Sequence, residues 1–215
     1  MRHFTAESIR GLDEGFRRNL INSLHGARPA LLVGTTSATG TDNLAVFSQV
    51  LHIGANPPLT GILFRPDSVE RHTLTNIRNN GAFTLNTATT AMAKQVHQTS
   101  ARYPQDVSEF AACGLTPIRM HSSRAPCVAE SPIQIELRLV REIPITENGT
   151  ILVVGEILHM YLRDDLLSDD GFVAHHIADS LAVAGLNAYF GLRNGQRLSY
   201  AKPDQPIQFE PLCEA

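Results

Sequence analysis

The chain has 215 residues, a formal net charge of −3 and three cysteines. A chain of this length fits one domain and can bury roughly 70% of its unfolded surface, so its core needs neither disulfides nor a metal. Its Lys and Arg residues are scattered, whereas a nucleic-acid groove needs a concentrated basic face. We therefore expect a single globular domain that does not bind nucleic acid.

The cysteines and the N-terminus indicate the compartment. Cys113, Cys127 and Cys213 are far apart and form no C-x-x-C pair, which is typical of reduced thiols. Cys113 and Cys127 are expected to be buried as small apolar residues. Residues 1–7 contain no apolar signal-peptide core, and the sequence has no 18-residue apolar run. We expect a cytoplasmic protein with no membrane partner.

Apolar spacing predicts the first elements. Apolar residues three and four apart across residues 8–24 predict one amphipathic helix. Arg28-Pro29 should end it, because the residue before a proline avoids the helical conformation. Residues 30–36 form a β-type run, and residues 43–50 are predicted to pair back with it as a hairpin. Residues 59–64 predict a third strand, whose partners are expected to be the first two.

A helix and a strand are predicted next. Asp67 and Glu70 have the spacing of a capping box, and Thr73 is a second possible cap. The helix should end at Gly81, because glycine readily adopts the left-handed conformation of a helix end. Residues 82–87 then predict another strand.

The second half of the chain is predicted to begin with two short helices, at residues 90–100 and 107–112. Alternation of apolar and polar residues from Ile133 predicts a half-buried strand, and residues 151–162 predict a long strand that Gly155 bends. Many strands with a few helices between them favour a closed or semi-closed β-barrel.

The predicted organisation is one domain covering residues 1–215. It comprises an N-terminal helix in 1–27, a barrel core in 28–165 and a C-terminal extension in 166–215. Within the extension, residues 174–184 are predicted to be helical, and the proline-containing tail from Arg197 is predicted to be extended.

Several common catalytic motifs are absent from the sequence. It contains no Walker A loop, no G-x-G-x-x-G, no H-E-x-x-H and no G-x-S-x-G. His175 and His176 are adjacent, but neighbouring side chains point apart while a zinc site needs convergent ligands, so no metal is expected.

Two arginines suggest an anion site. Loop arginines are ordinarily solvated and contribute little to stability, which is the alternative interpretation here. However, Arg65 ends a predicted strand, and Arg71 stands just before Thr73 near a predicted helix start. Guanidinium groups, a hydroxyl and the free N–H groups of a helix N-terminus together suit a phosphate. His72 offers a further donor.

Eight short segments carry a resemblance to a known family through their order and spacing. They are Arg28-Pro29-Ala30-Leu31-Leu32-Val33, Asn43-Leu44-Ala45-x-x-Ser48, Asn56-Pro57-Pro58, Thr73-Leu74-x-Asn76-Ile77, Phe83-x-Leu85-Asn86, Val107-Ser108-Glu109-Phe110-x-x-x-Gly114-Leu115-Thr116-Pro117, Ala129-Glu130-Ser131-Pro132 and Val154-Gly155-Glu156-Ile157. Over roughly residues 28–165, the chain resembles the flavin reductase-like, FMN-binding split-barrel family.

This resemblance implies a mainly β (α+β) fold, an FMN-binding split β-barrel with peripheral helices. It implies a homodimer with the flavin near the subunit interface. The residues implied at the flavin ring and ribityl chain are Asn43, Leu44, Ala45 and Ser48. Those implied at the phosphate are Arg65, Arg71 and Thr73, with His72 beside them. Asn86 completes the set, with an ordinary strand position as its alternative.

The implied function is that of an FMN-dependent oxidoreductase of the flavin reductase type. NADH or NADPH would deliver a hydride to the flavin, and the electrons would pass to a small-molecule or protein acceptor. Because the cofactor carries this chemistry, no catalytic side chain is assigned. The sequence differs from many relatives at Asn56, His72 and Thr150, where Asp, Asp and His are frequent. A flavoredoxin-like electron carrier and a non-catalytic barrel for a phosphorylated ligand remain alternatives.

Overall fold

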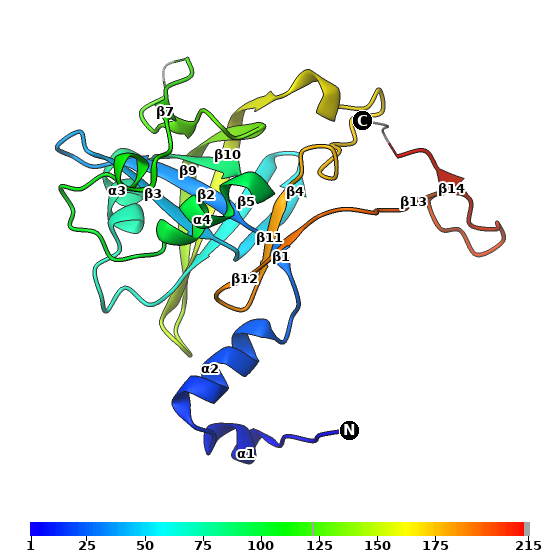
Figure 1. Cartoon of the computed structure of the whole chain (residues 1–215), viewed down its shortest axis with the longest axis horizontal. Coiled ribbons are helices and arrows are strands. Elements are labelled where there is room, and N and C mark those ends of the chain that lie inside the picture. Colours follow the sequence, from blue (N-terminus) through cyan, green and yellow to red (C-terminus); the bar gives the residue numbers. More distant parts are fainter. Residues whose placement is uncertain (122, 213–215) are drawn as a thin grey trace.

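A computed structural model describes residues 1–121 and 123–212, and its centre is a seven-stranded antiparallel sheet (Figure 1). The strand order is β3-β2-β6-β9-β10-β5-β4. In chain order these strands are β2 (Leu31–Thr36), β3 (Asp42–Phe47), β4 (Val50–Ala55), β5 (Pro58–Phe64), β6 (Ala82–Thr87), β9 (Ile133–Ile145) and β10 (Thr150–Leu162).

The sheet curls back on itself. Strands β3 and β4 form its two edges, yet only Ser48 and Gln49 separate them in the chain. The backbone N–H of Leu63 in β5 donates to the Gln49 carbonyl at 2.9 Å. A two-residue connection can join opposite edges only if those edges meet, so the strands form a barrel.

Smaller elements surround the barrel. One short sheet has the order β1-β11-β12, with β1 at Arg28–Pro29, β11 at Leu181–Ala184 and β12 at Ala188–Gly191. Two further pairs are β7 (Pro117–Ile118) with β8 (Cys127–Val128), and β13 (Arg197–Leu198) with β14 (Phe209–Glu210). The helices are α1 (Ala6–Arg10), α2 (Glu14–Ser23), α3 (His72–Asn80), α4 (Ala93–Gln98) and α5 (Glu109–Cys113), with 3₁₀ turns at Thr90–Met92 and Asp164–Leu166.

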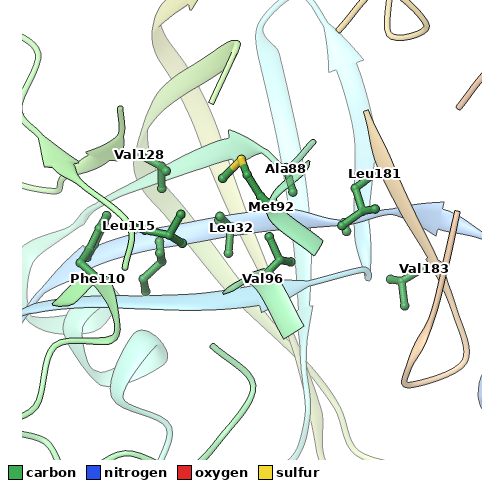
Figure 2. Packing of buried hydrophobic residues seen from close by; sticks show 11 residues of the cluster. Leu32, Ala88, Met92, Val96, Phe110, Leu115, Val128, Leu181 and Val183 are labelled. Carbon is green, nitrogen blue, oxygen red and sulfur yellow. The ribbon is translucent and has the colours of Figure 1, made fainter. Parts of the chain in front are cut away.

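Strand β2 contributes to two apolar clusters because successive strand side chains point to opposite faces. Val33 joins the barrel interior with Phe64 and Phe83, and α3 adds Leu74 to that cluster. Leu32 faces the other way, toward the residues from α4, α5 and β11 shown in Figure 2. Burying each large apolar side chain contributes about 1.5–3 kcal/mol, so these two clusters hold α3, α4 and α5 against the barrel.

Several predictions that rest on local chemistry are confirmed. Strands β2 and β3 form the predicted hairpin, and the turn between them closes with Ser37 N–H donating to the Thr41 carbonyl at 2.8 Å. Helix α3 ends at Gly81, which has a φ of 68°. The β9–β10 register shifts at Gly155, the glycine that was expected to bend β10. Cys113 and Cys127 are buried free thiols, and Cys213 lies outside the described residues.

The predicted partners of the third strand are wrong. Strand β5 pairs with β4 and β10, not with β2 and β3. The β2–β3 hairpin instead continues through β6, which pairs with β2 and leads to β9. Barrel closure determines this order, and alternation along one strand carries no information about it.

Two predicted helices are also wrong in extent or type. Residues 8–24 form parts of two helices, because the Asp13 side chain accepts from the Phe16 N–H at 2.9 Å and starts α2 anew. Residues 174–184 form turns followed by β11. Pairing of β11 with β1 on one side and β12 on the other overrides any local helical preference there.

No helix in the described parts of the chain is long and apolar enough to cross a membrane.

Gly34 provides a direct test of how the segment before β8 packs on β2. An alanine Cβ at this position would lie 2.1 Å from the Pro126 carbonyl oxygen and 2.6 Å from Thr84 Oγ1. The Gly34→Ala variant should therefore lose about 1–3 kcal/mol of unfolding free energy, measured by denaturant titration.

Gly11→Ala is the matched control, because its Cβ would meet nothing closer than 3.7 Å. This control should stay within about 0.5 kcal/mol of the wild type. Equal stabilities for the two variants would contradict the close packing at Gly34.

Candidate functional site

The N-terminus of α3 is the first part of the site. The helix begins at His72 with Arg71 as its N-cap, and no side chain caps it. The predicted capping box of Asp67 and Glu70 is therefore wrong, and Thr73 lies inside the first turn. Because a helix leaves its first N–H groups without partners in the helix, this end offers backbone donors and a positive dipole.

A buried polar network fixes this helix end to the β2–β3 hairpin. The Asn43 side-chain amide donates to Thr73 Oγ1 at 3.0 Å and to Thr35 Oγ1 at 3.2 Å. The Asn76 amide donates to the same Thr35 hydroxyl at 3.1 Å. All four side chains are buried, so these bonds replace contacts with water that the residues have lost. Asn43 and Thr73, both predicted site residues, are thus brought together.

The loop between β5 and α3 carries the two predicted arginines. Arg65 follows β5 directly and is exposed, and the Leu63–Gln49 bond places the end of β5 beside the connection containing Ser48. Arg71 is half-buried, and its Nε donates to the Pro66 carbonyl at 3.4 Å. Strand β3 therefore has the start of α3 near one end, through Asn43, and the Ser48 connection at its other end. The loop from Arg65 to Arg71 runs between the same two regions.

Along β3 the predicted residues differ in what they can offer a ligand. The Leu44 side chain is fully buried in the cluster that β3 shares with α5, so only its backbone can face a ligand. Ala45 and Ser48 are half-buried. His72, on α3, lies 3.8 Å from the Glu70 carboxylate and is also half-buried.

Asn86 lies apart from these residues. It has no exposed surface, and its amide donates to the Leu32 carbonyl at 3.1 Å and to Thr84 Oγ1 at 2.9 Å. Its side-chain oxygen accepts from the Val128 N–H at 2.9 Å. These bonds support a structural role between β6 and β8, and its assignment to the flavin stays a prediction.

Glu109 was not predicted as a site residue, although it adjoins the site. Its buried carboxylate accepts the Leu44 N–H at 2.9 Å, on the edge strand next to Asn43. Burial raises the pKa of this carboxyl, while the N–H groups of Leu44 and of Glu109 itself and the charge of His72 oppose the rise. Its partner lies 65 positions away in the sequence, so no local pattern could have revealed the contact.

The donor groups at the start of α3 are of the kind that bind an anion. No group of three or more possible metal ligands occurs in the described ranges. Two hollows of about 400 and 350 Å³ lie elsewhere, one inside the β13–β14 hairpin and one beside Tyr161 and Arg163. Neither hollow is lined by a predicted site residue.

Comparison with known proteins gives consistent results. Residues 24–178 match the family described as flavin reductase like domain. A protein from Shewanella frigidimarina named as a flavin reductase with a split barrel domain is 41% identical; the match covers 94% of this chain and 100% of that one, with a TM-score of 0.89.

Two more distant structures share the fold. Nitrilotriacetate monooxygenase component B of Bacillus cereus is 24% identical over 91% of this chain and 97% of its own, with a TM-score of 0.81. An FMN-binding protein of Thermus thermophilus is 18% identical over 94% of this chain and 100% of its own, with a TM-score of 0.73. The predicted family and fold are confirmed: this chain belongs to the flavin reductase like family and has a split-barrel fold.

Proposed function

We propose that the chain binds FMN along β3 and acts as a flavin reductase-type oxidoreductase. The observation that carries this proposal is the uncapped N-terminus of α3, flanked by Arg65 and Arg71 and tied to β3 through Asn43 and Thr73. Family membership and the FMN-binding protein of similar fold support the choice of ligand.

The donor set fits a phosphate. The first-turn N–H groups of α3, the Thr73 hydroxyl and the guanidinium of Arg71 can all donate, and each favours a negatively charged acceptor. Thr73 Oγ1 accepts from Asn43, which leaves its own proton free to be donated outward. His72, at the start of α3, and Arg65, at the end of β5, add further cationic or hydrogen-bond donor groups beside this helix end.

The remaining length of β3 would hold the ring. Ala45 is small and half-buried, so it lets a flat ring approach the strand, and Ser48 offers a hydroxyl at the far end. The bound flavin would accept a hydride from NADH or NADPH and pass the electrons to an acceptor. The protein's own contribution is orientation, which the Asn43 network supplies by fixing β3 against α3.

We also propose that the protein is a homodimer. On the outer face of the sheet, Leu51 and Ile53 of β4 and Leu152 of β10 gather over Gly61 of β5, within 3.0–3.2 Å of where its Cβ would stand. Leu51 and Ile53 remain 44% and 41% exposed. A second copy would cover this apolar face through one self-complementary contact, and it would add a wall to the flavin site.

One observation favours an electron carrier as the second candidate. Thr150 stands where related reductases often carry a histidine, and here its N–H and hydroxyl both donate to Asn148 Oδ1, at 3.0 and 2.7 Å. This residue closes the β9–β10 turn and presents no imidazole to a nicotinamide. A carrier of this kind would receive its electrons from a protein partner.

The phosphate assignment is tested by the Arg71→Ala variant. Loss of a charge-assisted bond of about 1.5–3 kcal/mol should weaken FMN binding roughly ten- to a hundredfold, while riboflavin binding should stay unchanged. Fluorescence titration of both flavins measures this difference. The exposed Arg18 of α2 provides the control, and Arg18→Ala should bind both flavins as the wild type does. Unaltered FMN binding in Arg71→Ala would place the phosphate elsewhere.

The two functional candidates differ in their electron donor. A flavin reductase loaded with FMN should oxidise NADH or NADPH continuously in the presence of free flavin and oxygen, seen as loss of the nicotinamide absorbance. An FMN-loaded protein that leaves both nicotinamides unoxidised, yet accepts electrons from dithionite, would instead support the carrier.

The dimer is tested by mass and by one substitution. Light scattering should give about twice the 23.5 kDa chain mass. Ile53→Glu should produce monomers with weakened FMN binding, because it places a charge in the apolar contact. Ile118→Glu on β7 is a control of similar exposure and should leave the dimer intact. A wild-type monomer that retains FMN on dilution would refute this arrangement.

A further inference from the structure

We propose that Glu109 is a positioning residue for the flavin site, which holds the edge of β3 through the Leu44 N–H and thereby makes flavin binding depend on pH. This inference rests on the proposed function, because the site that Glu109 positions is the FMN site along β3. It assigns a role to a buried carboxylate that binding and hydride transfer do not otherwise use.

The geometry supports this role through a short chain of contacts. Strand β3 is an edge strand, so β2 holds it on one side only. Glu109 of α5 supplies a partner on the other side, at 2.9 Å from the Leu44 nitrogen. The preceding residue, Asn43, holds Thr73 at the start of α3. A shift of Leu44 would therefore move both the ring-binding strand and the phosphate-binding helix end.

The charge of Glu109 matters for this bond. An ionised carboxylate accepts an N–H more strongly than a neutral carboxyl or amide does, roughly twofold in energy. Phe110, the residue after Glu109, lies in the apolar cluster with Leu44, so the carboxylate and the strand edge are packed together. Protonation of Glu109 should therefore loosen β3 without removing α5 from the barrel.

The fold and the site respond to this charge with opposite signs. Because burial raises the pKa of Glu109, the folded chain binds its proton more tightly than the unfolded chain does. The stability that this proton contributes is present at low pH and is lost as pH rises through the folded-state pKa. The same ionisation strengthens the bond to Leu44. The charge thus costs global stability while it orders the site.

Other groups around Glu109 influence its ionisation. His72, at the start of α3, is close enough for its charge to lower the pKa of Glu109, and the Glu70 carboxylate lies 3.8 Å from His72 Nε2. Cys113 lies one turn further along α5; burial raises the pKa of its thiol, and the charge of Glu109 adds to this. A bound phosphate would compete with Glu109 for His72, so FMN binding and Glu109 ionisation should be linked.

The experiment compares Glu109→Gln with the wild type at about pH 8 and about pH 4.5. The glutamine side chain of this variant keeps the shape and an acceptor oxygen but has no charge. At the higher pH, the FMN dissociation constant of the variant should rise about three- to tenfold, while its melting temperature rises above that of the wild type. At the lower pH, both differences should shrink toward zero. Titration of the phosphate itself cancels in each ratio, because both proteins bind the same ligand.

Glu130→Gln is the matched control, because the Glu130 carboxylate also accepts a backbone N–H, that of Thr116, at 3.1 Å. Glu130 is exposed, and the bond that it accepts is from Thr116 and not from a residue of the proposed site, so the FMN affinity of this variant should match the wild type at both pH values. A merely structural role for Glu109 would lower stability and affinity together at every pH. That result, or an unchanged FMN affinity at about pH 8, would overturn the proposal.

A second measurement needs neither the variant nor flavin. In the wild-type protein, the amide proton resonance of Leu44 should move with the ionisation of Glu109 during a pH titration followed by NMR. A Leu44 resonance that does not move between about pH 4 and 8 would overturn the proposal even if Glu109→Gln fails to fold. Failure of the wild type to bind FMN, with a Leu44 resonance that titrates, would reject the flavin function and leave the link from Glu109 to β3 standing.

Discussion

The hydrogen bond from Asn43 to Thr73 is the interaction on which the rest of the site depends. It joins an edge strand of the barrel to the first turn of α3 through two residues that lie 30 positions apart in the sequence. Thr35 accepts from both Asn43 and Asn76, so the hairpin and the helix share a single hydroxyl as their junction. Because buried polar groups are costly when left unpaired, this network favours one arrangement of strand and helix over alternatives.

In that arrangement the N-terminus of α3 keeps backbone N–H groups available for a ligand. An uncapped N-terminus has unsatisfied N–H groups, which water or a ligand must complete. Arg71 occupies the N-cap position without capping, and its guanidinium turns back to Pro66 in the same loop. The fold therefore leaves donors of the helix unused at the place where the loop brings cationic side chains. This combination is the basis for proposing an anionic group as the ligand at the start of α3.

Sequence reasoning succeeded for several features whose cause is local, although it missed the Asp13 cap that divides the first helix in two. The strand from Ile133, the turn between β2 and β3, and the left-handed Gly81 each depend on residues within a few positions of one another. It failed where distant segments decide the outcome. The partners of β5 follow from barrel closure, and β11 is a strand because β1 and β12 pair with it.

The candidate site shows the same division. Arg65, Arg71 and Thr73 could be proposed from a strand end and a nearby helix start, although the capping residues chosen for that helix were wrong. The flavin contact of Asn43 stays a prediction, and its hydrogen bonds to Thr73 and Thr35 could not be read from the sequence. Glu109 could not be found at all, because a lone acid at the start of a short helix resembles an ordinary first-turn residue.

A crystal structure of the wild-type chain grown with FMN tests the central claim most directly. The account predicts that the phosphate lies within hydrogen-bonding distance of the first-turn N–H groups of α3 and of Arg71, with the ring along Ala45 and Ser48 of the β3 edge. A phosphate bound away from the start of α3, with the Asn43–Thr73 bond intact and the helix end facing solvent, would contradict it.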